Sequence, residues 1–258
     1  MQNFRETLEE ARQFLREPRP IPAPRRNQSY PRPKDSRAAA ERLFRSSRPV
    51  PGTLAETYLR GRAITASLDW PCLRFHPACY YRSDQASPRQ AWAALLGAVT
   101  DAQGKLTGLQ RTYLARNGRG KAPLETPRRA MGRLLGNAVR FGKPSDVMAA
   151  GEGIETMLSL LSLFPAMPMA AALSAAHLAA FHFPRGLCRL YLLRDNNAAG
   201  EFAAERLGAR CREAGIELRL LTPLAKDLNI DINVGPAGAV KARLLAQMAP
   251  QDRSRFGA

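Results

Sequence analysis

The stretch Val147-Met-Ala-Ala-Gly-Glu-Gly-Ile-Glu155 decides how the second half of this sequence folds. An apolar run suited to a buried strand stops at a carboxylate between two glycines, and a helical pattern follows at once. The stretch Leu190-Tyr-Leu-Leu-Arg-Asp-Asn-Asn-Ala-Ala-Gly200 has the same arrangement. Because ligands bind at the carboxyl ends of parallel strands in open α/β sheets, we expect Glu152 and Asp195 to face one crevice.

Strand and helix patterns alternate through the whole region after Lys143. The expected strands span 147–150, 167–173, 188–193 and 216–222, and the expected helices span 154–163, 175–181, 198–214 and 237–248. This alternation favours a parallel sheet with right-handed crossovers, flanked by helices. We therefore predict an α/β domain over residues 146–258.

The preceding region has a different pattern, which predicts a smaller α+β module over residues 49–145. Ser36 is positioned to cap one helix, and Thr53 with Glu56 forms a capping box for a second helix that ends at Gly61. Short strand patterns run from Leu73 to Phe141, including 94–100 and 106–114 on either side of a turn at 101–104.

Residues 1–48 are predicted to be a basic, proline-rich arm with short helices. Residues 3–16 have an amphipathic helical period, and from Pro18 to Arg37 prolines alternate with arginine and lysine. That segment is too poor in apolar residues to offset the entropy of ordering, so we expect an extended, flexible chain. It could lie along phosphates or serve only as a soluble linker, and the sequence favours neither.

The charge balance indicates a nucleic-acid partner. The chain has 39 Lys and Arg against 22 Asp and Glu, a formal net charge of +17, and the excess is concentrated in segments. The alternative is a basic surface that serves solubility alone. The most basic stretch, 111–143, has Glu125 as its single acid. Within it we predict contacts to nucleic-acid or nucleotide phosphates for Arg111, Arg119, Lys121, Arg128 and Arg129.

The cysteines and the hydropathy pattern favour a cytoplasmic protein that has no contact with a membrane. Cys72, Cys79, Cys188 and Cys211 form no CxxC pair, so we interpret them as reduced thiols. Cys72, His76 and Cys79 are wrongly spaced for a zinc site. The sequence has no apolar signal core at its start and no run of about 18 apolar residues.

Oxygen-bearing side chains follow three of the expected strands. Glu155 lies one helical turn after Glu152, and Asn197 lies two residues after Asp195. A third group, Lys226-Asp-Leu-Asn-Ile-Asp231, follows the fourth strand. Oxygen ligands around one crevice suit a hard cation such as Mg²⁺, which retains several waters.

At these residues the chain resembles the Toprim domain shared by bacterial-type primases, type IA and II topoisomerases and several nucleases. It is most similar to primase-like Toprim proteins of plasmids, prophages and integrative elements. The matching motifs, over about residues 146–232, are Gly-Glu152-Gly-Ile-Glu-Thr, Asp195-Asn-Asn-Ala-Ala-Gly and Lys226-Asp-Leu-Asn. The stretches 58–64, 110–114 and 120–122 resemble the module that precedes Toprim in those proteins.

The resemblance implies phosphoryl-transfer chemistry on nucleic acid. It makes Glu152 the general base or acid, and Asp195, Asn197 and Asp227 the ligands of Mg²⁺, with Mn²⁺ as the alternative ion. Glu155 would be an outer ligand, and Lys226 would contact phosphate. Asn197 replaces the second aspartate of the family, Asn229 replaces a frequent carboxylate, and the zinc ribbon of many primases is absent.

The expected function is that of a primase-like, Mg²⁺-dependent nucleotidyltransferase in replication or transfer of a mobile element. Its partners would be DNA, expected to be single-stranded, nucleoside triphosphates, and a helicase or another replication protein. Two alternatives stay open: a Toprim nuclease that cleaves DNA or RNA, and a non-catalytic DNA-binding accessory protein. A topoisomerase is disfavoured because the chain has no tyrosine-bearing cleavage domain of adequate size.

Overall fold

The computed structural model describes residues 36–84 and 87–257, which belong to one compact unit. The expected helix at 3–16 and the proline-rich segment up to residue 35 lie outside the described residues. The boundaries expected at 48/49 and 145/146 stay predictions.

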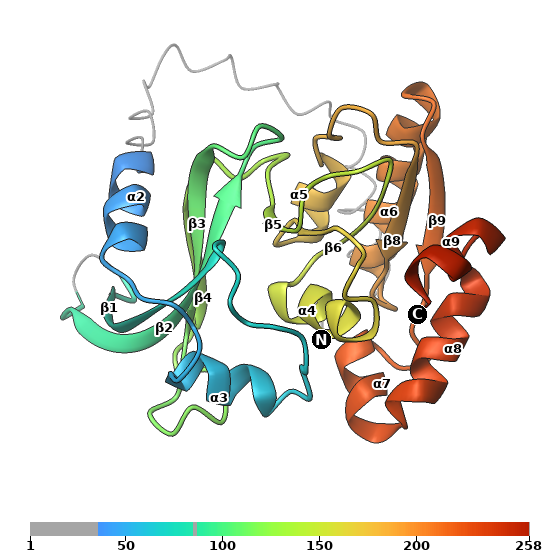
Figure 1. The fold of residues 1–258 in the computed structure, drawn as a ribbon. Helices are drawn as coiled ribbons and strands as arrows, with labels where there is room; N and C mark the ends of the chain where they lie inside the picture. Colours follow the sequence, from blue (N-terminus) through green and yellow to red (C-terminus); the bar gives the residue numbers. More distant parts are fainter. Residues whose placement is uncertain (1–35, 85–86, 258) are drawn as a thin grey trace, which may run out of the picture. The chain divides into compact units, whose positions relative to one another are not determined.

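The first part of the described chain is an antiparallel sheet of four strands in the order β1-β2-β3-β4 (Figure 1). The strands are β1 (Leu73–Tyr81), β2 (Gln90–Thr100), β3 (Leu106–Tyr113) and β4 (Arg128–Gly132). Helix α2 (Arg37–Arg45) packs on one face through Ala40, and α3 (Leu54–Arg60) lies on the opposite face with Leu59 in the main core. This is the α+β module that the strand patterns predict.

The second part is a mixed, mostly parallel sheet in the order β5-β7-β6-β8-β9. Its strands are β5 (Val139–Phe141), β6 (Val147–Gly151), β7 (Met169–Ala171), β8 (Arg189–Leu193) and β9 (Glu217–Leu221). Strands β6 to β9 pair in parallel, whereas β5 pairs antiparallel to β7 at the edge. The predicted α/β sheet flanked by helices is confirmed, with an antiparallel edge strand that the sequence did not indicate.

Helices cover both faces of the second sheet (Figure 1). They are α4 (Ile154–Leu163), α5 (Ala175–Ala179), α6 (Ala198–Glu213), α7 (Leu228–Val234), α8 (Ala237–Gln247) and α9 (Pro250–Phe256). Leu178 of α5 and Leu207 of α6 pack with Leu192 on one face, and α4, α7, α8 and α9 pack on the other. No helix among the described residues is long and apolar enough to span a bilayer.

Three details differ from the sequence-based expectations. Ser36 does not cap α2, because its Oγ accepts a hydrogen bond from the Gly132 amide on β4 instead. Helices α7 and α9 were not expected. The side chain of Asp227 caps α7, and Asp252 holds α9 through contacts with Arg189 and Tyr191 on β8, which are distant in sequence.

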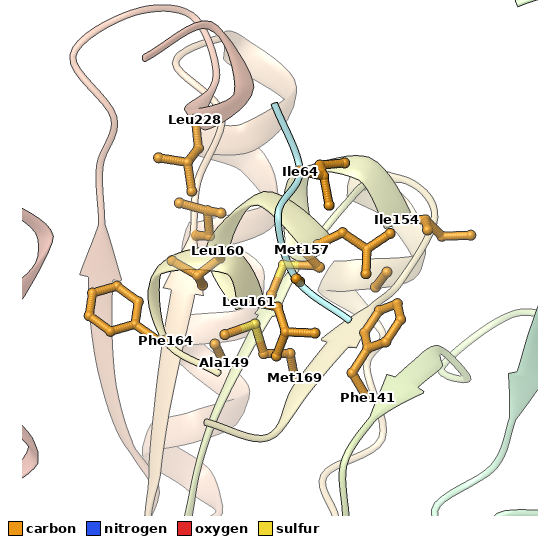
Figure 2. Packing of buried hydrophobic residues seen from close by; sticks show 14 of the residues in the cluster. Ile64, Phe141, Ala149, Ile154, Met157, Leu160, Leu161, Phe164, Met169 and Leu228 are labelled. Carbon is orange, nitrogen blue, oxygen red and sulfur yellow. The ribbon is translucent and has the colours of Figure 1, made fainter. Parts of the chain in front are cut away.

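Helix α4 links the two sheets. Nearly all of its side chains are buried, and they pack with residues of both sheets. Its residues belong to a core cluster that also contains Leu95 of β2 and Tyr191 of β8. Figure 2 shows Met157 and Leu161 of α4 within this cluster, with Phe141 of β5 beside them. The residue after β6 and the first turn of α4 are therefore fixed relative to both sheets.

The two glycines of α6 give opposite predictions for the same substitution. A Cβ at Gly200 would lie 2.3 Å from the carbonyl oxygen of Asp195, whereas one at Gly208 would lie 3.5 Å from Leu218 in ordinary contact. We expect Gly208→Ala to raise the free energy of unfolding by about 0.5–1 kcal/mol through helix propensity. Gly200→Ala should lower it by about 1–3 kcal/mol, because backbone must move. Urea denaturation measures both, and a stabilising Gly200→Ala would contradict the close approach of α6 to Asp195.

Candidate active site

Three connections bring the predicted acids to one cavity of about 170 Å³. Glu152 lies between β6 and α4, and Asp195 follows β8. Asp227 lies in the connection after β9, where its carboxylate accepts a hydrogen bond from the Ile230 amide (3.0 Å). All three line this cavity, at the carboxyl edge of the parallel strands.

The lining of the cavity also includes cations, which come from the first part of the chain. Arg62, Lys121 and Arg128 line it together with the acids. Lys121 and Arg128 are two of the predicted phosphate contacts, whereas Arg62 was not predicted. Arg62 lies in the 58–64 stretch that resembles the module preceding Toprim, but no local pattern showed that it would face carboxylates.

Glu155 is held as a buried, charged group between the two parts of the chain. Only 4 % of its surface is exposed, and its Oε1 accepts a hydrogen bond from the hydroxyl of Tyr58 on α3 (2.8 Å). Burial raises the pKa of Glu155, but the positive charges of Arg128 and Lys121 together with hydrogen bonding outweigh it and leave the pKa lowered. The predicted role as an outer metal ligand stays a prediction.

The pKa values of the Glu152 and Asp195 carboxyl groups are both raised. Burial raises the pKa of Glu152, and the charge of Asp195 raises it further. Burial, followed by the charge of Asp227, likewise raises the pKa of Asp195. The Oε1 atom of Glu152 is buried without a hydrogen-bond partner among the described residues. A hard cation that prefers oxygen ligands would offset the repulsion between the carboxylates and would give the Glu152 Oε1 atom a partner. The donor set therefore fits Mg²⁺.

The acids line one cavity, but their side chains do not converge closely enough to form a metal-binding cluster by themselves. No three His, Cys, Asp or Glu side chains in the described part of the chain lie close enough to hold a metal ion by themselves. Mg²⁺ is commonly bound by one or two carboxylates and keeps several of its waters, so this spacing is compatible with such an ion.

Asn197, a predicted ligand, has a structural role that the sequence also permits. Its Oδ1 accepts a hydrogen bond from the Gly200 amide (2.8 Å) and so caps α6, and it does not line the cavity of the acids. The neighbouring Asn196 donates to the carbonyl oxygens of Pro223 and Ala225. A contribution of Asn197 to metal binding stays a prediction.

Two polar residues beyond the predicted set position the lining groups. The carboxylate of Asp231 accepts hydrogen bonds from the amides of Leu224 and Ala225 (2.8 Å each), in the loop that leads to Asp227. It also pairs with Arg243. Asn229 donates to the backbone carbonyl of Arg62 (2.6 Å), so it anchors the segment that carries one of the cations lining the cavity.

The other predicted phosphate contacts lie outside this cavity. Arg129 stacks on the Tyr81 ring (4.4 Å), and its guanidinium donates to the Ser83 carbonyl and the Thr126 hydroxyl. Arg111 lines a separate cavity on the first sheet, and the exposed Arg119 and Lys226 line none of the cavities described here. Their contacts to phosphate stay predictions.

Two family matches divide the described chain near the boundary between the sheets. Residues 34–141 match a domain of unknown function, DUF7146, and residues 147–236 match the Toprim domain. The Toprim match contains Glu152, Asp195 and Asp227.

Solved primase structures are similar to this chain at low sequence identity. The Aquifex aeolicus primase, with its zinc-binding and RNA polymerase domains, is 14% identical with a TM-score of 0.56, over 95% of this chain and 67% of that one. The RNA polymerase domain of Mycobacterium tuberculosis primase DnaG is 16% identical with a TM-score of 0.48, over 80% of each chain. The bacteriophage T7 primase fragment is 13% identical with a TM-score of 0.47, over 68% of this chain and 66% of that one.

The similarity to the Aquifex aeolicus structure shows a common fold and extends through both sheets. This chain spans about two thirds of the length of the Aquifex aeolicus and T7 chains. A comparison with curated proteins found no match.

The repulsion among the acids predicts a stability test. Because the pKa of Asp195 is raised in the folded state, its ionisation destabilises the fold, and stability is lost as the pH rises through the folded pKa. At neutral pH, Asp195→Asn should therefore raise the free energy of unfolding by an amount on the order of 1 kcal/mol. Thermal unfolding measures this, with the exposed Asp69→Asn as the matched control.

Two further measurements distinguish repulsion between the acids from a general effect of surface charge. The gain from Asp195→Asn should shrink as the pH falls, because the wild-type carboxyl becomes protonated. Mg²⁺ should raise the melting temperature of the wild type more than that of the variant. An Asp195→Asn variant that is less stable than the wild type at neutral pH would contradict the repulsion.

Proposed function

We propose that this chain is a primase-like, Mg²⁺-dependent nucleotidyltransferase that acts on DNA in replication or transfer of a mobile element in the cytoplasm. The observation that carries the proposal is the cavity that Glu152, Asp195 and Asp227 line together with Arg62, Lys121 and Arg128. Acids that suit a metal beside cations that suit phosphates are the parts that phosphoryl transfer requires.

The carboxylates would have two different roles, metal binding and general base catalysis. Asp195 and Asp227, with Asn197 as a further oxygen donor, would hold Mg²⁺, which supplies neutralisation of charge that develops on phosphate oxygens. Glu152 would accept the proton of the attacking hydroxyl, and its raised pKa makes it a stronger base than an ordinary glutamate. Arg62, Lys121 and Arg128 would hold the phosphates by charge.

The partners follow from this chemistry and from the charge of the chain. A nucleotidyltransferase of this kind takes nucleoside triphosphates and a DNA template, which we propose to be single-stranded. The net charge of +17 suits a polyanion. A helicase or another replication protein would bring the template to the site.

Primer synthesis tests the proposal directly. Purified protein with single-stranded DNA, nucleoside triphosphates and Mg²⁺ should form short oligonucleotides. Glu152→Gln keeps the shape of the side chain but removes the base, so we expect product formation to fall by at least about 100-fold. Glu205→Gln, an exposed position on α6, is the matched control and should retain full activity.

The same preparation distinguishes the two alternatives. Metal-dependent cleavage of DNA or RNA in the absence of nucleotides, abolished by Glu152→Gln, would identify a nuclease instead. Salt-sensitive DNA binding that a chelator does not change, with neither product formed, would identify a DNA-binding accessory protein. Equal primer synthesis by wild type and Glu152→Gln would overturn the proposed role of Glu152.

A further inference from the structure

A second cavity, of about 320 Å³, adjoins the cavity of the acids. Glu152, Arg128 and Leu173 line both cavities, so the two meet at the proposed general base. This volume lies in the range of small-molecule sites. A ligand with its charged part among the acids and cations could therefore extend into the second space.

The second cavity differs from the first in the chemistry of its lining. Gln110 of β3, Ser174 at the start of α5 and His177 within α5 contribute polar hydrogen-bonding groups, and Ala130 and Leu173 contribute apolar surface. Arg129 also reaches this cavity, but its guanidinium donates to Ser83 and Thr126 as described above. The lining suits a polar, uncharged ring system better than a further phosphate.

One of these side chains, His177, has hydrogen-bonding capacity that the described chain does not use. The Nδ1 atom of His177 is buried and has no hydrogen-bond partner among the described residues. Gln110 is 5 % exposed. Buried polar groups normally have partners, so an unsatisfied histidine nitrogen beside a cavity suggests that a ligand completes the set.

The backbone between the two cavities is strained. Leu173 has a φ of 79°, a left-handed conformation that a leucine rarely adopts. Its amide donates a hydrogen bond to the backbone carbonyl of Glu152 (2.7 Å), which fixes the two residues to each other. Backbone strain of this kind is concentrated at functional sites, where surrounding contacts maintain it.

We propose that the second cavity binds the nucleoside of a nucleoside triphosphate whose phosphates lie in the first cavity. In this arrangement Gln110 and His177 are specificity-determining residues that contact the base or the sugar. The inference rests on the proposed function and extends it from phosphate binding to recognition of the nucleotide. The cations Arg62, Lys121 and Arg128 hold the phosphates, and the polar and apolar side chains that line only the second cavity hold the ring system.

Comparison of a nucleoside triphosphate with inorganic triphosphate isolates the second cavity. Calorimetric titration in Mg²⁺ should show that wild type binds ATP or another nucleoside triphosphate more tightly than inorganic triphosphate. His177→Ala and Gln110→Leu should each weaken nucleoside triphosphate binding by roughly 2- to 10-fold, the value of a hydrogen bond or two. Binding of inorganic triphosphate should not change, because its site is intact.

Matched controls exclude general effects of these substitutions. His182→Ala and Gln103→Leu change exposed residues outside this cavity and should leave both affinities unchanged. Melting temperatures identify a variant that no longer folds. Gln110 is buried in a strand, so Gln110→Leu can be unstable. In that case the affinities of His177→Ala for nucleoside triphosphate and inorganic triphosphate test the inference.

The outcomes separate this inference from the proposed function. Loss of discrimination in His177→Ala supports the nucleoside site even if no primer is made, in which case the proposed function alone fails. Primer synthesis with unchanged nucleotide affinity in the variants overturns the nucleoside site alone. Equal binding of nucleoside triphosphate and inorganic triphosphate by wild type also overturns it. So does an effect of His177→Ala confined to a single-stranded oligonucleotide, which would assign the cavity to the template.

Discussion

The concentration of negative charge at one edge of a sheet is the constraint on which the rest of this structure depends. Parallel strands direct Glu152 and Asp195 to the same side, and burial makes their mutual repulsion costly. Countercharge must come from elsewhere in the chain, and it comes from the first part through Arg62, Lys121 and Arg128. Glu155, whose pKa is lowered despite its burial by the charges of Arg128 and Lys121, accepts a hydrogen bond from Tyr58 and so connects the two parts at this point.

One consequence is that the two family matches describe one site. The Toprim match supplies the acids, and the match to a domain of unknown function, at 34–141, contains Tyr58, Arg62, Lys121 and Arg128. The proposed chemistry needs both, because the acids alone repel phosphate. Helix α4 provides the mechanical connection, since its side chains pack against both sheets. We infer that the first domain is a working part of the site rather than a separate binding module.

Local sequence patterns predicted the features that depend on local physics. The apolar runs of β6 and β8 are followed by Glu152 and Asp195, and parallel pairing then brings these acids and Asp227, in the connection after β9, to one cavity. Patterns could not predict contacts made at long range. Arg62, Gln110 and His177 face the site only because of how the two sheets pack, and α9 depends on Asp252 contacting β8. Asn197 shows a second limit of sequence patterns. A side-chain oxygen two residues after the acid that ends a strand can be a metal ligand or can cap the next helix, and the pattern does not distinguish the two.

The location of a bound divalent ion tests the central claim most directly. Crystals of the protein soaked with Mn²⁺ and measured at the manganese absorption edge reveal the ion by its anomalous signal. The account predicts a peak in the cavity lined by Glu152, Asp195 and Asp227. An ordered Mn²⁺ bound only elsewhere, or no peak at Mn²⁺ concentrations that support catalysis, would contradict it.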